Sequence, residues 1–161
     1  MRSTVATLAI EPSLLDKLVD DAPGQSEHYR GASLALMRQS VRRDLENLLN
    51  AKVRWHQWPA SFTELDTSLV TYGLPDFSAL PVGALEGRQL LCRQVADAIR
   101  RFEPRFQAVE VEVVDNDLPL DRILRLRIHA LLRADPVPEA LVFDSEVEPV
   151  HLGLTVMEGR G

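Results

Sequence analysis

Two ionisable residues flank a proline in the middle of the chain, in the stretch Glu103-Pro104-Arg105. A carboxylate held at such a fixed point is a candidate general acid for cleavage of a glycosidic bond. The guanidinium beside it is suited to binding a carboxylate through two parallel hydrogen bonds. Glycoside hydrolysis needs a second carboxylate across the bond, and no motif in the sequence singles one out. Catalysis by Glu103 therefore has weak support.

The other common catalytic and metal-binding signatures are absent from the sequence. The four histidines form neither an HExxH motif nor a close i,i+4 pair, which argues against a zinc site. Cys92 is the only cysteine, so neither an intramolecular disulfide nor a cysteine metal cluster can form. The GxSxG elbow and the glycine-rich phosphate-binding loops are also missing. The sequence thus predicts no catalytic residue, no metal ligand and no cofactor, and we expect a protein that is not an enzyme.

Composition and charge are those of an ordinary soluble domain. The chain has 161 residues, and its net charge of -6 gives no electrostatic reason to expect nucleic acid or an anionic membrane as partner. No stretch approaches the roughly 20 apolar residues that span a bilayer, so we expect a soluble protein without membrane insertion. We expect an N-terminal arm, residues 1–32, whose short helix ends at a Pro-Gly turn, followed by a single domain, residues 33–161.

Two long helices are predicted from apolar residues that recur three and four positions apart. The first covers residues 33–50 and the second covers residues 83–102. The stripe of the first helix consists of Leu34, Met37, Val41, Leu45, Leu48 and Leu49. The second helix should end before Pro104, because proline disfavours the helical conformation of the residue that precedes it.

Alternating apolar residues after the second helix predict a meander of strands. The first strand carries Val109, Val111 and Val113 on one side. Later strands are expected at residues 123–132, 141–143 and 150–156. A further short strand is expected at residues 69–71, between the helices. Together these elements predict an α+β fold, in which two main helices pack on a mostly antiparallel sheet of about four strands, with a short N-terminal helical arm.

With these elements in place, the sequence resembles TssE, the small baseplate wedge subunit of the bacterial type VI secretion system. TssE is similar to the small wedge protein of contractile phage tail baseplates. The matching stretches are residues 12–18 (PSLLDKL), residues 40–50 (SVRRDLENLLN), residues 72–76 (YGLPD) and Glu103-Pro104-Arg105. Ala51-Lys52 departs from the family, which usually continues with Thr-Arg at this point.

The resemblance implies a structural role at the cytoplasmic, membrane-proximal baseplate of a contractile injection machine. There the protein would link the wedge to the first sheath layer. The implied partners are the wedge subunits TssF, TssG and TssK and the sheath subunits TssB and TssC. An open sheet edge would accept a strand of another chain, and Asp144, Glu146 and Glu148 would select a basic one. The residues expected at partner contacts are Glu103, Pro104, Arg105, Arg42, Arg43 and Asp44.

Each of these assignments has an alternative. The family was historically labelled lysozyme-like, so the alternative function is a peptidoglycan hydrolase that uses Glu103. Arg42, Arg43 and Asp44 form either a solvated helix face or a polar surface that a neighbouring protein recognises. Arg105 either forms a surface ion pair or presents its guanidinium to a carboxylate of the wedge core.

Overall fold

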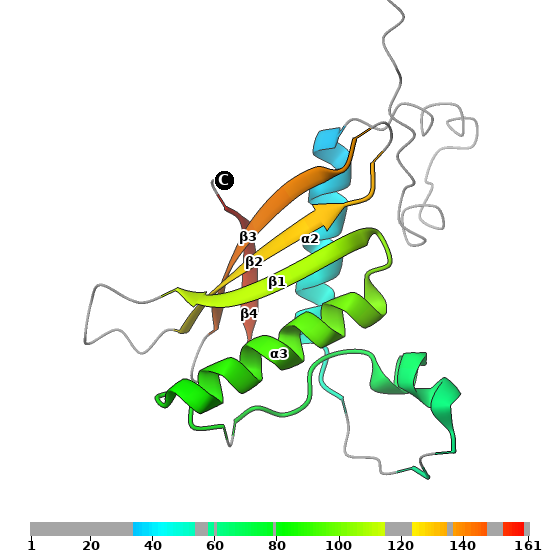
Figure 1. The fold of residues 1–161 in the computed structure, drawn as a ribbon, viewed down its shortest axis with the longest axis vertical. Helices are drawn as coiled ribbons and strands as arrows, with labels where there is room; N and C mark the ends of the chain where they lie inside the picture. The colour runs from blue at the N-terminus through cyan, green and yellow to red at the C-terminus, as the bar shows by residue number, and fades with distance from the viewer. Residues whose placement is uncertain are drawn as a thin grey trace, which may run out of the picture.

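The computed structural model of the chain describes residues 34–53, 58–59, 61–78, 80–114, 124–134, 137–147 and 153–159. Two helices and a sheet of four antiparallel strands confirm the predicted α+β fold (Figure 1). The predicted N-terminal arm, residues 1–32, lies outside the described residues. Among the residues described, no helix has both the length and the apolar character needed to cross a bilayer.

Helix α2 (Leu34–Asn50) coincides with the first predicted helix. Its apolar residues recur every three or four positions, which gathers them on the face that packs against the sheet. The buried members of this face are Met37, Val41, Leu45, Leu48 and Leu49. In the last turn, the side-chain amide of Asn50 donates to the carbonyl of Glu46 at 2.8 Å.

Helix α3 (Leu85–Phe102) is the second predicted helix, although it begins two residues later than expected. The N–H of Ala84 donates to the carbonyl of Pro81, so the chain is still in a turn at that point. The helix ends where predicted. Glu103 has φ -118° and ψ 83°, outside the helical region, as expected for the residue before Pro104.

The sheet is an antiparallel meander in the order β1-β2-β3-β4. Its strands are β1 (Phe106–Val114), β2 (Leu124–Leu132), β3 (Glu139–Val147) and β4 (Leu154–Glu158). Strand β3 extends beyond the predicted residues 141–143, because the acidic residues after Phe143 remain paired with β2 and β4. Val150 and Leu152, which were expected in the last strand, lie outside the described residues.

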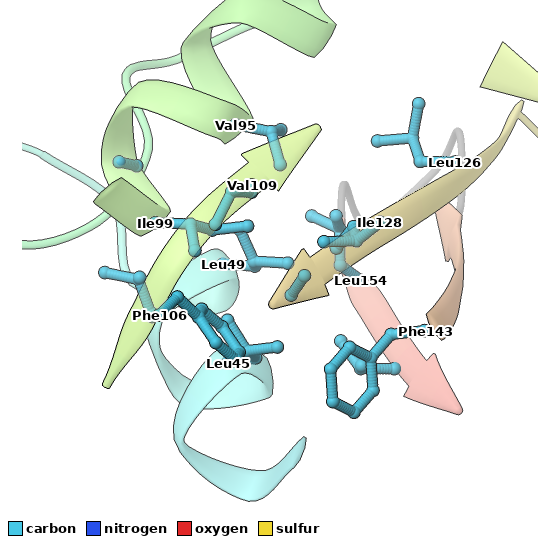
Figure 2. Close-up of a cluster of buried hydrophobic side chains, with 14 of the residues drawn as sticks. Leu45, Leu49, Val95, Ile99, Phe106, Val109, Leu126, Ile128, Phe143 and Leu154 are labelled. Carbon is cyan, nitrogen blue, oxygen red and sulfur yellow. The ribbon is translucent and has the colours of Figure 1, made fainter. Parts of the chain in front are cut away.

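The core lies between one face of this sheet and both helices. Figure 2 shows Leu45 and Leu49 of α2 and Val95 and Ile99 of α3 converging on side chains of the strands. Phe143 of β3 is fully buried among them. Burying side chains of this size contributes about 1.5–3 kcal/mol each. The core therefore fixes both helices to the sheet, and with them the start of β1.

The other face of the sheet carries charged pairs between strands. Arg127 of β2 lies opposite Asp144 of β3, with Nε 2.8 Å from Oδ1. Arg125 lies opposite Glu146 in the same way, at 3.0 Å. Cross-strand pairs of opposite charge contribute roughly 0.2–1 kcal/mol. This pairing explains how β3 continues through its acidic stretch.

The prediction of a strand at residues 69–71 is wrong. This segment is the 3₁₀ helix η3 (Leu69–Thr71), which follows the 3₁₀ helix η2 (Thr63–Thr67). The β-branched residues favoured a strand, but local hydrogen bonds decide the conformation here. The hydroxyl of Ser68 accepts from the N–H of Val70 at 3.3 Å and caps η3. In the described part of the chain, no strand lies next to this segment to pair with it.

Candidate interaction site

The α3–β1 joint brings Glu103 and Arg105 into direct contact around Pro104. Arg105 Nε donates to Glu103 Oε1 at 2.7 Å, and Nη2 donates to Oε2. The backbone N–H of Arg105 adds a third hydrogen bond to Glu103 Oε1, at 3.1 Å. The guanidinium and the carboxylate therefore form a paired, two-pronged contact of the kind that Arg forms most readily.

Helix α2 supplies a second carboxylate to the same guanidinium. Arg105 Nη2 lies 2.7 Å from Asp44 Oδ2, and Arg43 lies against the other oxygen of Asp44 at 3.2 Å. We call Asp44, Glu103 and Arg105 the joint cluster. The side chains of Glu103 and Arg105 are 7% and 15% exposed. The cluster is thus a mostly buried brace that ties α2 to the end of α3 and the start of β1.

Tyr72 completes the surroundings of the joint cluster. Its ring packs edge-on against Phe102 at the end of α3, with 5.3 Å between the ring centroids. Burial raises the pKa of the Tyr72 phenol, and the negative charges of Asp44 and Glu103 raise it further. Glycine and proline predicted a turn at residues 72–76, but the proximity of this turn to the joint depends on the packing of distant elements.

The pKa of Tyr72 provides a test of this arrangement. In a Tyr29→Phe background, tyrosinate absorbance should report Tyr72 titrating above the ordinary value of about 10. Asp44→Asn should lower that pKa only in part, since burial remains. Because the folded state raises the pKa, this group's stabilising effect is complete below the unfolded pKa and is lost as pH rises through the folded one. Titration at the same pH in native buffer and in urea would contradict the arrangement.

The six residues expected at partner contacts divide into two groups. Arg105 contacts both Glu103 and Asp44, Arg43 contacts Asp44, and Pro104 lies exposed in the turn between Glu103 and Arg105. Arg42 belongs elsewhere. Its guanidinium points to β4, and Nη1 lies 3.2 Å from the carbonyl of Val156 on that strand. The same nitrogen lies 3.3 Å from the carboxylate of Glu46, one turn further along α2.

This contact of Arg42 is part of a wider closure of the β4 edge. The side chain of Asn50 donates to the carbonyl of Leu154 at 2.7 Å and accepts from its N–H at 2.9 Å. It occupies the backbone groups that a neighbouring strand would use. Arg38 adds an ion pair to Glu158 near the end of β4. Side chains of α2 therefore cover backbone positions on this edge, a common protection against unwanted strand pairing.

The β1 edge is covered less. Arg100 of α3 donates to the carbonyl of Val109 at 2.7 Å, so this carbonyl faces away from β2. Antiparallel strands alternate between residues that face the partner and residues that face away, so Val111 and Val113 also turn outward. Within the residues that the structure describes, no side chain caps the backbone of either one.

The expected role of the acidic residues needs a correction. Asp144 and Glu146 were expected to select a basic strand from a partner. They already pair with Arg127 and Arg125 inside the sheet. Glu148 lies outside the described residues. On the strand at the open edge, Glu110 and Glu112 are the exposed carboxylates, and Glu112 lies 3.2 Å from His129.

The geometry gives no support to hydrolysis by Glu103. A general acid needs a proton on an oxygen that can reach the leaving group. Both oxygens of Glu103 accept hydrogen bonds from Arg105, and the side chain is almost completely buried. Across the described ranges, no group of three or more His, Cys, Asp or Glu residues could hold a metal ion. The arrangement is that of a structural brace.

Comparison with known proteins identifies the family. The sequence model described as "Baseplate wedge protein gp25" matches residues 35–137. This range contains α3, all of α2 except its first residue, the joint cluster and strands β1 and β2. The match places the chain in the class of baseplate wedge proteins, which are structural components. The chain belongs to the gp25 family of this class.

Two curated relatives and one solved structure are also similar to the chain. The relatives are the anti-adapter proteins IraD of Salmonella arizonae, 32% identical over 92 residues, and of Salmonella paratyphi A, 29% identical over 92 residues. Each match covers 57% of this chain and 62% of the relative, so the chain spans about three fifths of their length. A chain of "The baseplate complex from the type VI secretion system" has a TM-score of 0.48 and 18% identity, covering 71% of this chain and 96% of that chain.

Proposed function

We propose that the chain is a TssE-type wedge subunit of a type VI secretion baseplate and that it links the wedge to the first sheath layer without catalysis. Membership of the baseplate wedge family supports the structural role. The observation that carries the linking role is the difference between the two sheet edges. Side chains of α2 cover backbone groups of Leu154 and Val156 on β4, whereas none of the residues that the structure describes covers Val111 or Val113 of β1 in this way.

The β1 edge is the surface proposed for the sheath. An extended segment of TssB or TssC would pair with the outward N–H and C=O groups of Val111 and Val113. Glu110 and Glu112 would favour basic side chains at the facing positions, where opposite charges contribute about 0.2–1 kcal/mol per pair. Backbone pairing would supply the affinity, and these charges would set the register.

The outer side of the joint cluster is the surface proposed for the wedge subunits TssF, TssG and TssK. The internal ion pairs hold Pro104 and Arg43 in fixed positions, where both reach solvent. A surface fixed in this way loses little conformational entropy when a partner binds. Baseplate assembly would occur in the cytoplasm at the membrane-proximal end of the machine.

Proline substitution at outward-facing amides tests this assignment. Val111→Pro removes one outward N–H on β1, and Glu158→Pro removes one on β4 as the matched control. Binding to purified TssB–TssC and to purified TssF–TssG is measured by biolayer interferometry, and folding by circular dichroism. We expect Val111→Pro to weaken sheath binding by about 10-fold or more and to keep wedge binding. Glu158→Pro should keep both.

Two results would contradict the proposal. Sheath binding that is equal in Val111→Pro and the wild type would overturn the use of the β1 edge. A wild-type chain that binds neither complex would overturn the function itself. Lysis of purified cell wall by the wild type, but not by Glu103→Gln, would support the alternative function of a peptidoglycan hydrolase.

A further inference from the structure

We infer that a second docking element projects beside the joint cluster. It is the η loop, defined as residues 61–71, and we propose that it inserts apolar side chains into a pocket with a basic rim on a wedge subunit. This inference rests on the proposed function for the identity of the partner. Figure 1 shows the loop, in teal at the lower right, standing away from the sheet and from both main helices.

The η loop exposes large apolar side chains to solvent. Phe62, Val70 and Leu69 are 55%, 47% and 88% exposed. Burial of such side chains gains roughly 25 cal/mol per Å² of apolar area, so leaving three of them in water within one short loop is unfavourable for an isolated chain. Neighbouring exposed apolar residues of this kind mark interaction sites more often than chance.

Local hydrogen bonds hold the η loop in one conformation. The hydroxyl of Thr71 lies 3.0 Å from the carbonyls of Leu65, Asp66 and Ser68, and Thr71 is buried. The hydroxyl of Ser68 lies 2.9 Å from the carbonyl of Leu65. These bonds fold the loop upon itself although its apolar side chains do not join the core. A preorganised loop loses little entropy when it binds, which favours affinity.

Charge defines the partner's chemistry. Glu64 and Asp66 lie exposed in η2, between Phe62 and Leu69 in the sequence. In the described part of the chain, no cation pairs with either carboxylate. A protein pocket lined with apolar side chains and edged with Lys or Arg would match both features of the loop. An anionic membrane surface would repel the same carboxylates.

The η loop is continuous with the proposed wedge surface. Thr71, its last residue, is followed directly by Tyr72, whose ring lies against Phe102 and near Asp44 and Glu103. A subunit seated on the outer side of the joint cluster therefore lies next to the base of the loop. This continuity assigns the loop to the wedge subunits, while the β1 edge is left for the sheath.

Substitutions confined to the loop tip test the inference. Phe62→Ser/Leu69→Ser/Val70→Ser removes the apolar side chains, and Glu64→Lys/Asp66→Lys reverses the charges of exposed residues that make no ion pairs in the described chain. Leu85→Ser and Val137→Ser are matched controls, since both residues are exposed and lie elsewhere. Dissociation constants for purified TssF–TssG are measured at several salt concentrations, with circular dichroism to verify folding.

We expect the triple substitution to weaken TssF–TssG binding by about 10-fold or more, as removal of central apolar contacts does at other interfaces. The charge reversal should weaken binding at low salt and flatten its salt dependence. Both controls should bind like the wild type. If the charge-reversed and triple variants bind as tightly as the wild type, the η-loop inference falls and the proposed function stands. If the wild type itself binds no wedge subunit, both fall.

Discussion

Arg105→Met is expected to lower the free energy of unfolding by about 3 kcal/mol, because it leaves the buried carboxylate of Glu103 without its cation and leaves Asp44 with Arg43 alone. Glu103 and Asp44 are held against this guanidinium from α3 and α2. Without it, the two negative charges lie close together in a site that excludes most water. Urea unfolding followed by circular dichroism measures the change.

Arg127→Met is the control for this prediction. Arg127 contacts Asp144 at 2.8 Å, nearly the same distance as Arg105 to Asp44, but both side chains are 37% exposed. Pairs exposed to water contribute about 0–1 kcal/mol, so this variant should lose little stability. Adding Glu103→Gln to Arg105→Met should recover part of the loss, since it removes one unpaired charge. Equal losses in the two methionine variants would show that burial of the joint cluster does not matter.

A large loss of stability in Arg105→Met would also mean that substitutions of Arg105 cannot test wedge binding separately from folding. Arg105→Glu would place a third carboxylate beside Asp44 and Glu103, and loss of partner binding in that variant would report a weakened fold. Substitution of Pro104 or Arg43, at the outer side of the cluster, separates the two effects. Either change leaves the hydrogen bonds between Arg105 and Glu103 in place.

Gly73→Ala should cost about 3 kcal/mol or more, the sum of backbone strain and a steric clash. Gly73 has φ 119°, a conformation that residues with a side chain rarely adopt. A Cβ atom there would lie 2.2 Å from the carbonyl oxygen of Ala51. That oxygen accepts a hydrogen bond from the N–H of Leu74 at 2.8 Å. Moving it would break the contact between the residue that follows α2 and the segment after Tyr72.

Gly83→Ala is the matched control for the glycine prediction. A Cβ atom at Gly83 would meet nothing within 4 Å, and its φ is not in the region that favours glycine. We expect a change within about 0.5 kcal/mol, as for most surface substitutions. In Gly73→Ala the titration of Tyr72 should also move toward its ordinary pKa, since the phenol is displaced from the joint. Unchanged thermal unfolding of Gly73→Ala would contradict this account.

The helices and strands were predictable because their signals are local. Apolar spacing located α2 and β1, and Pro104 located the end of α3. The segment at residues 69–71 failed because its β-branched residues suggest a strand, while Ser68 and Thr71 hold it in a 3₁₀ turn through hydrogen bonds that composition does not reveal.

The site was only partly predictable because its contacts are not local. Glu103 and Arg105 could be predicted as a pair because only Pro104 separates them. Asp44 lies 61 positions before Arg105, so its contact with Arg105 could not be predicted. The residue spacing places Asp44 off the apolar stripe of α2. Its contact with Arg105 depends on how α2 packs against α3 and β1, which the sequence pattern does not reveal. The same holds for Asp144 and Glu146, whose partners on β2 follow from strand register.

Unequal sheet edges limit how many copies can associate. A sheet with two free edges permits fibres, since each added copy presents a new edge to the next. Asn50 and Arg42 occupy backbone groups on the β4 side, so edge-to-edge growth between identical copies would stop at a symmetric pair joined through β1. Because only the β1 edge can pair with another strand, each copy can lie at the end of an extended sheet but not between two other copies.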